Sequence, residues 1–594
     1  LLHSTGLKFS KVAFDHSIGV TNVNIKYFDK TKSNKIDVCL SRTSPSIGVL
    51  IDSKCALFES IVTFASEYVL FDSVHKWLIL HEIHDGVGDD YSYNDTKSLT
   101  KHIPYMTLFR SLNLSVNADI VVASHKDNDS CILYDVFNFG KNRDGRFVVK
   151  AIGSWNTVTG LNLTRTSKYY RRFDYHQMVL KLILVMSPPP KNFDPQMLLT
   201  WNPASNVPAL THTSSIFMHE IAEIHNIRYN YTVVDVWIGD YKREHAYTAA
   251  NGIYFHEHDV TPVLRMLLSH FDKYDVAFPV TRVETRFFYK IPTQGVGKFE
   301  NKFLKPFSKN AWLSVVGITL LCGLMLLLSM IVEERRPLSL VYPIFSVLAL
   351  ICQQFFEEFE DLRSISSVRK LTTLVTGVFC LLTYNYYTSS VVSWLLNAPP
   401  PSINSLWELL DSPLQPVFQD TGFSYSWLQV PNYYYNTKHA KAEDELKKKM
   451  KKLEKKGKPI LIFPKDGISL VKEGGYVYHG EVDSANKIIA ETFKQRELCD
   501  LGSLQSMDKT FAYISVQKRS PYKEFFTWSS LRLMETGILN RIHKRTLSGA
   551  NKCEGSTPRA LALGGAAPAF ILLAAGYILA VILVVFERII HHHQ

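Results

Sequence analysis

Four apolar stretches interrupt an otherwise mixed pattern of hydrophobic and polar positions. Residues 312–332 run for 21 positions without a charge, residues 371–396 for 26, and residues 568–586 form a third long run. At about 1.5 Å per residue, each of these three can cross a hydrocarbon core of about 30 Å as a helix. Residues 341–352 are apolar over only 12 positions, which suits a re-entrant segment. We therefore predict membrane helices at 312–332, 371–396 and 566–586, a re-entrant segment at 338–356 and a cytoplasmic tail at 587–594.

Residues 1–171 alternate short apolar runs with one helical pattern. Strand-like runs lie at 47–51, 77–80, 120–123 and 147–152, and residues 55–71 have helical spacing. This alternation predicts a modest α/β domain. The chain begins at Leu1 rather than Met, so either a leader has been removed or the sequence starts within a longer one.

Residues 172–303 show a longer series of alternating elements. We predict a buried strand at 179–186, a helix at 214–227 and a strand at 229–237. Residues 262–271 are predicted to be a helix, with Thr261 as its N-cap and Pro262 at its first position, before a strand at 274–280. Such a series is typical of a parallel sheet with helices on its faces. Residues 398–560 show a similar alternation, with elements at 415–418, 460–463, 482–494 and 511–516 and a helix at 524–545.

The net charge of +11 is concentrated in one segment. Residues 438–458 hold ten lysines against four acids, and Leu446, Met450 and Leu453 follow helical spacing. This pattern indicates a solvated surface helix. No aromatic interleaving or nucleic-acid motif accompanies the lysines, so a nucleic-acid partner is not expected.

Five Asn-x-Ser/Thr sequons precede the first apolar stretch. Their position favours an extracellular, glycosylated N-terminal region, on the same side as residues 398–560. The candidate glycosylation sites are Asn94, Asn113, Asn128, Asn162 and Asn230.

The cysteines and histidines point to no metal, cofactor or catalytic centre. Cys499 and Cys553 are well placed for a disulfide in an oxidising compartment, while Cys39, Cys55 and Cys131 leave an odd number near the N-terminus. His219-Glu220 begins like a zinc-binding helix, but the second histidine one turn later is missing. No nucleophile elbow or phosphate-binding loop is present, so we do not expect an enzyme.

Several further short motifs follow one another along the chain. Pro279-Val280-Thr281 is followed by Arg286; Gln353-Gln354 ends the short apolar stretch; a Tyr/Thr/Ser-rich run, 386–395, lies late in the second span. Residues 420–424 read DTGFS, residues 476–481 read YVYHGE, and Cys499 and Cys553 follow. In this order over residues 172–590, the motifs resemble those of the insect chemosensory ionotropic receptors, a variant branch of the ionotropic glutamate receptor family.

The resemblance implies a fold and a set of roles. The fold would be a two-lobed, periplasmic-binding-protein-like α/β ligand-binding domain, formed by segments 172–303 and 398–560 and split by an α-helical pore domain. A short α/β N-terminal domain, 1–171, would precede it. The implied ligand residues are Pro279, Thr281, Arg286, Ser424 and Glu481; the implied pore residues are Gln353 and Gln354; the implied gate residues are Tyr387, Thr388, Ser389, Ser390 and Ser393; and Cys499 and Cys553 would form the family's disulfide.

The resemblance also implies a mechanism. A guanidinium binds a carboxylate through two parallel hydrogen bonds, so Arg286 suits an acidic ligand, although Arg282 lies near enough to compete for this role. Ligand-driven lobe closure would open a tetrameric cation pore that is permeable to monovalent cations, with calcium as a further candidate ion. Co-receptor subunits would complete the tetramer in the plasma membrane of sensory neurons. Glu357, Glu358, Glu360 and Asp361 would attract cations to the inner mouth, unless they form only a solvated loop.

Departures from the family pattern argue against glutamate as the ligand. Ser424 replaces a threonine, Phe423 precedes it, and Phe355 follows the paired glutamines in place of a glycine. We therefore expect an odorant or tastant, such as a small organic acid, an amine or an amino acid. The alternatives are a co-receptor subunit that binds no ligand and a glutamate-gated receptor.

Overall fold

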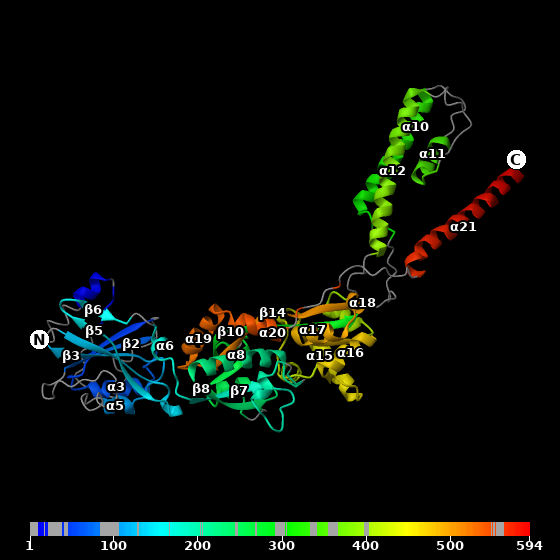
Figure 1. Cartoon of the computed structure of the whole chain (residues 1–594). Coiled ribbons are helices and arrows are strands. Elements are labelled where there is room, and N and C mark those ends of the chain that lie inside the picture. The colour runs from blue at the N-terminus through cyan, green and yellow to red at the C-terminus, as the bar shows by residue number, and fades with distance from the viewer. Residues whose placement is uncertain are drawn as a thin grey trace.

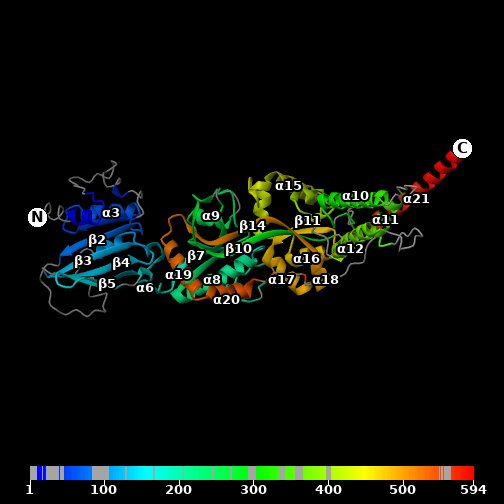
Figure 2. The same cartoon turned by 90° about the horizontal axis from the view of Figure 1, so that it is seen from above.

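The computed structural model describes most of the chain. The residues outside the description are 1–9, 17, 22–38, 41–45, 83–105, 128–129, 165–166, 202, 205, 244–246, 268–269, 292–302, 305, 333–340, 355–365, 397–402, 548, 550–552, 554–562 and 594. An N-terminal α/β domain, a large mixed sheet and the membrane helices follow one another along the molecule (Figures 1 and 2).

The N-terminal domain is built on a six-stranded sheet in the order β1-β2-β3-β4-β5-β6. The first three strands are parallel, and the remaining pairs are antiparallel. Helices α3 and α5 bury an apolar face against this sheet, so the predicted α/β character is confirmed. The elements are β1 (Ile47–Asp52), α3 (Phe58–Glu67), β2 (His75–Glu82), α5 (Met106–Ser111), β3 (Asp119–Asp127), β4 (Ser130–Asn138), β5 (Phe147–Asn156), β6 (Gly160–Leu163) and α6 (Lys168–Arg171).

A buried arginine joins this domain to the next. The guanidinium of Arg172 donates to Asp135 Oδ1 at 2.6 Å and to the carbonyls of Val116 and Ala118. It also lies over the ring of Phe137. A charge this deeply buried is tolerated only when it is paired and hydrogen-bonded, so these contacts attach the start of the second segment to the N-terminal domain.

The second domain is one eight-stranded sheet in the order β12-β11-β13-β10-β14-β9-β7-β8. Strands β10 and β14 are 17 residues long and run antiparallel through its centre. At one end β9 pairs with β14, and β7 and β8 follow; at the other, β13 pairs with β10, and β11 and β12 follow. The strands are β7 (Met178–Val185), β8 (Ile227–Val234), β9 (Val260–Arg265), β10 (Tyr274–Lys290), β11 (Gln415–Gln419), β12 (Leu461–Ile462), β13 (Tyr476–Glu481) and β14 (Leu501–Gln517).

Helices cover this sheet and divide its core into three apolar clusters. One surrounds α8, α19 and α20, and another surrounds α16 and α17. The third joins the two ends of the sheet and draws residues from before and after the membrane helices. The helices are α7 (Gln196–Leu199), α8 (Ala209–His225), α9 (Ala249–Tyr254), α13 (Leu406–Asp411), α14 (Gly422–Gln429), α15 (Ala440–Lys455), α16 (Pro464–Glu473), α17 (Val482–Thr492), α18 (Gln495–Cys499), α19 (Lys523–Glu535) and α20 (Ile538–Thr546).

Three predictions about this domain were wrong. The first four residues of the helix predicted at 262–271 instead belong to strand β9, which ends at Arg265, because β-branched residues favour the sheet and Pro262 falls where the register between β9 and β14 shifts. The sheet is mixed rather than parallel, since its long central strands are antiparallel. The helix predicted at 524–545 is broken into α19 and α20 at Gly537, whose φ of 78° is left-handed.

Helices occupy all three predicted spans. They are α10 (Lys309–Val332), α12 (Ser367–Leu396) and α21 (Leu563–His593), with the short α11 (Val341–Ile351) between the first two. Helices α10, α11 and α12 pack together, whereas α21 stands apart from them (Figure 1). Among the described residues, α10 and α21 are long and apolar enough to cross a membrane. Helix α12 is 30 residues long, but its second half is rich in Tyr, Thr and Ser, so its crossing stays a prediction.

Candidate ligand-binding site

A cavity of about 50 Å³ lies in the cluster that joins the two ends of the sheet. Strands β9, β10 and β14 supply part of its wall, and α14 and the segment after it supply another part. Residues from before and after the membrane helices therefore meet in one space. Apart from one arginine, one threonine and two tyrosines, the lining side chains are all apolar.

Arg265, the last residue of β9, is the one charged residue among the described residues that line the cavity. Its Nη2 donates to the Tyr435 carbonyl at 3.4 Å, and its own carbonyl accepts from the Tyr274 hydroxyl at 2.9 Å. Burial raises the pKa of Tyr433, and the nearby Arg265 guanidinium opposes this rise. Nη1 is buried and donates to no acceptor within the described part of the chain. A guanidinium so placed can bind an anion within the cavity.

A hydrogen-bonded chain lies behind the cavity-lining Thr285. The Ser506 hydroxyl donates to the Thr285 carbonyl at 2.9 Å, and it lies 2.7 Å from Thr285 Oγ1 and 2.8 Å from His479 Nε2. Since a hydroxyl has one proton, both of these groups must donate to Ser506. Burial lowers the pKa of His479 to about 3, so the imidazole is neutral. These three hydrogen-bonded side chains therefore form a fixed, uncharged support for the cavity wall.

Glu481 lies on the same face, because it pairs with Thr285 across β13 and β10. Its Oε2 accepts from the Ser484 hydroxyl at 2.8 Å, while Oε1 has no hydrogen-bond partner among the described residues. Burial and the nearby Asp483 raise the pKa of Glu481 to about 8. The carboxyl group is therefore mostly protonated at neutral pH, and it is a poor partner for a ligand ammonium.

This shift predicts a pH-dependent stability. The carboxyl pKa rises from 4.5 to about 8 on folding, so the folded state binds the extra proton between these values. Stability from this group is complete below about pH 4.5 and is lost as the pH rises through 8. We expect the melting temperature of the full-length protein to fall from pH 5 to pH 8.5, and Glu481→Gln to flatten this slope.

The matched control for this experiment is Glu454→Gln, on the exposed side of α15, which should leave the slope unchanged. Some slope will persist in Glu481→Gln, because burial also raises the pKa of Asp483 to about 6. A Glu481→Gln protein with the wild-type slope would show that Glu481 is ionised in the folded state.

The other residues implied by the family resemblance lie at different depths. Thr281 is buried on β10, and Pro279 lies half-buried two residues before it; neither lines the cavity. Ser424 is fully buried in α14, next to the cavity-lining Phe423. Ser424 is therefore the neighbour of a lining residue but is not itself part of the cavity wall. The Pro-x-Thr motif lies on β10, two residues before the lining residue Val283.

Arg286 lies outside the cavity. Side chains alternate across a strand, so Arg286 projects to the opposite side of the sheet from its neighbour Thr285. Its Nε pairs with Glu284 Oε1 at 2.6 Å, and its Nη1 donates to Ser503 Oγ at 3.3 Å. Arg282 instead stacks over the ring of Phe511. Of the arginines near this motif, Arg265 is the one that the fold brings to the cavity.

Sequence reasoning missed Arg265 because it predicted a helix over that segment. The usable signal was the β-branched run Val260, Thr261 and Val263, which favours a strand that ends at the arginine. Tyr433 and Tyr435 were also missed, since alternating aromatic residues in a loop carry no recognisable motif.

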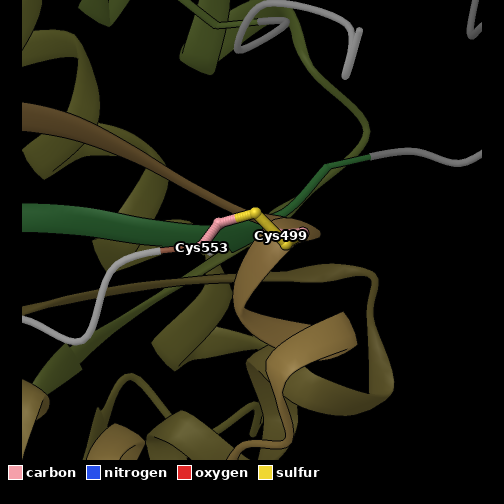
Figure 3. The surroundings of a disulfide bond; sticks show 2 residues. All are labelled: Cys499 and Cys553. Carbon is pink, nitrogen blue, oxygen red and sulfur yellow. A yellow bond between two sulfur atoms is a disulfide. The ribbon is translucent and has the colours of Figure 1, made fainter. Parts of the chain in front are cut away.

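The predicted disulfide is present. Cys499, at the end of α18, is bonded to Cys553, which precedes α21 (Figure 3). The bond attaches the chain segment that leads to α21 to the end of the sheet that carries β13. Among the described residues the remaining cysteines are free.

The predicted pore residues follow the short helix α11. Gln353 and Gln354 are exposed just beyond its end, and Gln353 has a left-handed φ of 56°. The residues Phe355, Glu357, Glu358, Glu360 and Asp361 lie outside the described part of the chain.

All of the predicted gate residues lie on α12. Tyr387 donates to the carbonyl of Phe303 at 3.2 Å and packs against Phe307 and Trp312. Thr388 instead donates to the Tyr384 carbonyl within its own helix, and Ser389, Ser390 and Ser393 follow on the same helix. The region around Tyr387 therefore contacts the segment that enters α10.

Three predicted glycosylation sites lie on described surfaces. Asn162 on β6 and Asn230 on β8 are exposed, and Asn113 is half-buried. Asn94 and Asn128 lie outside the described residues. Within the described chain, no group of three His, Cys, Asp or Glu side chains is arranged to hold a metal ion.

Comparisons with known proteins extend along most of the chain. Residues 1–185 match the family of the ionotropic receptor 75a N-terminal region. Ionotropic receptor 75a of Drosophila sechellia is 24% identical over 580 residues, covering 92% of this chain and 87% of the relative. The receptor of the same name in Drosophila melanogaster is 23% identical over 533 residues, covering 84% and 79%. The N-terminal match and the two relatives show that the chain is similar to the insect ionotropic receptors 75a along most of its length.

Proposed function

We propose that the protein is the ligand-recognising subunit of a tetrameric ligand-gated cation channel, completed by co-receptor subunits of its family. The ligand is a small carboxylate with a short apolar remainder. It occupies the cavity between the two ends of the eight-stranded sheet, with its carboxylate on Arg265. The observation that carries this proposal is the half-buried Arg265, whose buried Nη1 has no hydrogen-bond partner among the described residues, in the wall of a mostly apolar cavity.

The cavity chemistry favours a simple acid over an amino acid. An ammonium group needs a carboxylate or several acceptors, and the described part of the chain brings no carboxylate to the cavity wall. Glu481, the residue expected to hold an amine, is bonded to Ser484 and mostly protonated at neutral pH. Apolar residues such as Leu210, Val283 and Met507 instead suit a short alkyl group.

Opening would follow from the way the ligand joins the two ends of the sheet. A carboxylate held by Arg265 of β9 also contacts the tyrosines that follow α14, so it stabilises the closed arrangement of these segments. Their movement is transmitted to the membrane helices through the linkers on either side. The contact of Tyr387 with Phe303 joins the gate helix α12 to one of these linkers.

The test is a current measurement on the full-length protein, co-expressed in oocytes with a co-receptor subunit of the family. Sodium salts of straight-chain monocarboxylates with two to six carbons are applied at constant pH. We expect an inward cation current in response to part of this series and none to glutamate or to alkylamines. A channel silent to every acid would favour a subunit that binds no ligand, and a current evoked by glutamate alone would favour a glutamate receptor.

The same currents test the pore. Gln353 is neutral and exposed at the end of α11, where we propose it lines the narrowest point. Gln353→Arg is expected to reduce calcium permeability relative to sodium by about tenfold, because a ring of positive charge repels divalent cations more strongly. Reversal potentials measured in calcium-only solution give this ratio.

The matched variant for the pore experiment is Gln353→Asn, which should keep the wild-type permeability. If Gln353→Arg left the calcium permeability unchanged, Gln353 would not lie at the narrowest point.

A further inference from the structure

The lysine-rich helix α15 carries two inward-facing charged residues, Glu443 and Lys447, one helical turn apart. They face residues 433–436, which we call the tyrosine segment. Its Tyr433 and Tyr435 line the cavity, whereas α15 contributes no residue to the cavity wall.

Glu443 is 3% exposed and holds the tyrosine segment by its backbone. Its Oε2 accepts from the backbone N–H of Tyr435 at 2.9 Å and from the Trp427 indole N–H at 2.7 Å, and its Oε1 accepts from the backbone N–H of Asn436 at 2.8 Å. A carboxylate that accepts three N–H groups in a buried site makes strong, charge-assisted hydrogen bonds. This one side chain therefore connects α14, through Trp427, with the tyrosine segment.

Lys447 holds the same segment from the next turn. Its ammonium donates to the Tyr433 carbonyl at 2.8 Å and lies 4.7 Å from the centre of the Tyr434 ring and 5.2 Å from that of Trp427. Asp444, between the two, accepts from the Tyr434 hydroxyl at 3.3 Å. Glu443 and Lys447 thus bond the backbone of the tyrosine segment at three of its four residues, namely Tyr433, Tyr435 and Asn436.

We propose that Glu443 and Lys447 are positioning residues that set the ligand size which the cavity accepts. They keep the tyrosine segment against Arg265, so that Tyr433 and Tyr435 close the cavity around a short chain. This inference rests on the proposed function, because it assigns these residues to the cavity of that function. The rings face the ligand, and the two charges on α15 act only through the backbone that carries the rings.

Releasing the segment has a defined consequence. In Glu443→Ala, two backbone N–H groups and the indole N–H lose their acceptor, and a buried donor left unpaired is costly enough to favour an open arrangement. The tyrosine rings then withdraw, the cavity lengthens, and contacts with short ligands weaken. Lys447→Met removes the bond to Tyr433 but keeps the packing of the aliphatic stem.

The first arm of the test needs no ligand. Hydrogen exchange of the full-length protein in nanodiscs should be about 10- to 100-fold faster at residues 433–436 in Glu443→Ala and in Lys447→Met than in the wild type. The matched controls are Glu445→Ala and Lys448→Met, which change the same charges on the exposed face of α15, where these two residues form an ion pair with each other. Both controls should keep wild-type exchange.

The second arm uses the carboxylate series in the co-expressed channel. Glu443→Ala and Lys447→Met should raise the half-maximal concentration of the shortest active acid by about tenfold. They should also shift the preference towards longer chains, whereas the two control variants should match the wild type. A merely structural role would weaken responses to all chain lengths equally.

Each outcome decides the inference. Unchanged exchange at 433–436 in both variants would overturn it, as would faster exchange with an unchanged chain-length preference. A wild-type channel silent to every acid would contradict the proposed function, and the exchange arm alone would then decide whether α15 positions the segment.

Discussion

Replacing Arg265 by alanine is expected to raise the half-maximal concentration for carboxylate activation by about 100-fold or to abolish the response. Truncating one partner of a buried, hydrogen-bonded charge pair costs roughly 3 kcal/mol, and every 1.4 kcal/mol corresponds to about a tenfold change in affinity. The ligand loses this binding energy in full, because the described residues that line the cavity include no second cation to replace Arg265. Dose–response curves for the full-length channel with its co-receptor measure this change.

The control for this prediction is Arg286→Ala. Arg286 is paired with Glu284 on the opposite side of the sheet, so its removal should shift the dose–response curve less than about threefold. Arg265→Lys tests geometry as well as charge, because an ammonium cannot form the bidentate bond of a guanidinium, and we expect an intermediate loss. If the carboxylate activated Arg265→Ala but not Arg286→Ala, Arg286 rather than Arg265 would be the residue that binds the ligand.

Removing the Cys499–Cys553 disulfide is expected to destabilise the domain that carries the eight-stranded sheet by roughly 4 kcal/mol. The bonded cysteines are 54 residues apart, and closing a loop of this length lowers the entropy of the unfolded chain by an amount that corresponds to this energy. For a domain of this size the midpoint of thermal unfolding should fall by roughly 10 °C. The variant is Cys499→Ser with Cys553→Ser, so that no unpaired thiol remains, and the measurement is a melting curve of the full-length protein in nanodiscs.

The control for the disulfide is Cys55→Ser, which removes an exposed free thiol from the N-terminal domain and should leave the midpoint unchanged. Wild-type protein treated with a reductant should melt near the double variant. A double variant that melts within about 2 °C of the wild type would mean that the loop is already constrained in the unfolded chain, against the entropic account.

The site itself could be predicted from the sequence only in part. Residues 476–481 were singled out only through the family resemblance, and in the structure they form strand β13, which ends at Glu481. The protonation of Glu481 was not foreseen, since it depends on burial beneath residues far away in the chain. Arg286 was assigned to the ligand on spacing alone, and spacing does not report on which side of the sheet a residue projects.

Features that depend on neighbouring residues or on composition can be predicted directly from the amino-acid sequence. These are the positions of the apolar helices, the strands at 47–51, 179–186 and 415–418, the surface helix at 438–458 and the cysteines available for a disulfide. Hydrophobic periodicity and length are local properties, so a single chain shows them directly.

Only the tertiary structure decided the arrangement on which recognition depends. Residues 260–265 form strand β9 where a helix was predicted to begin, because β14, some 250 residues later in the chain, pairs along the edge of β9. The same pairing brings Arg265 into the cavity, and the alternation of side chains along β10 turns Arg286 away from it. The register between distant strands is set by their combined burial and hydrogen bonding, and no local window of sequence contains that information.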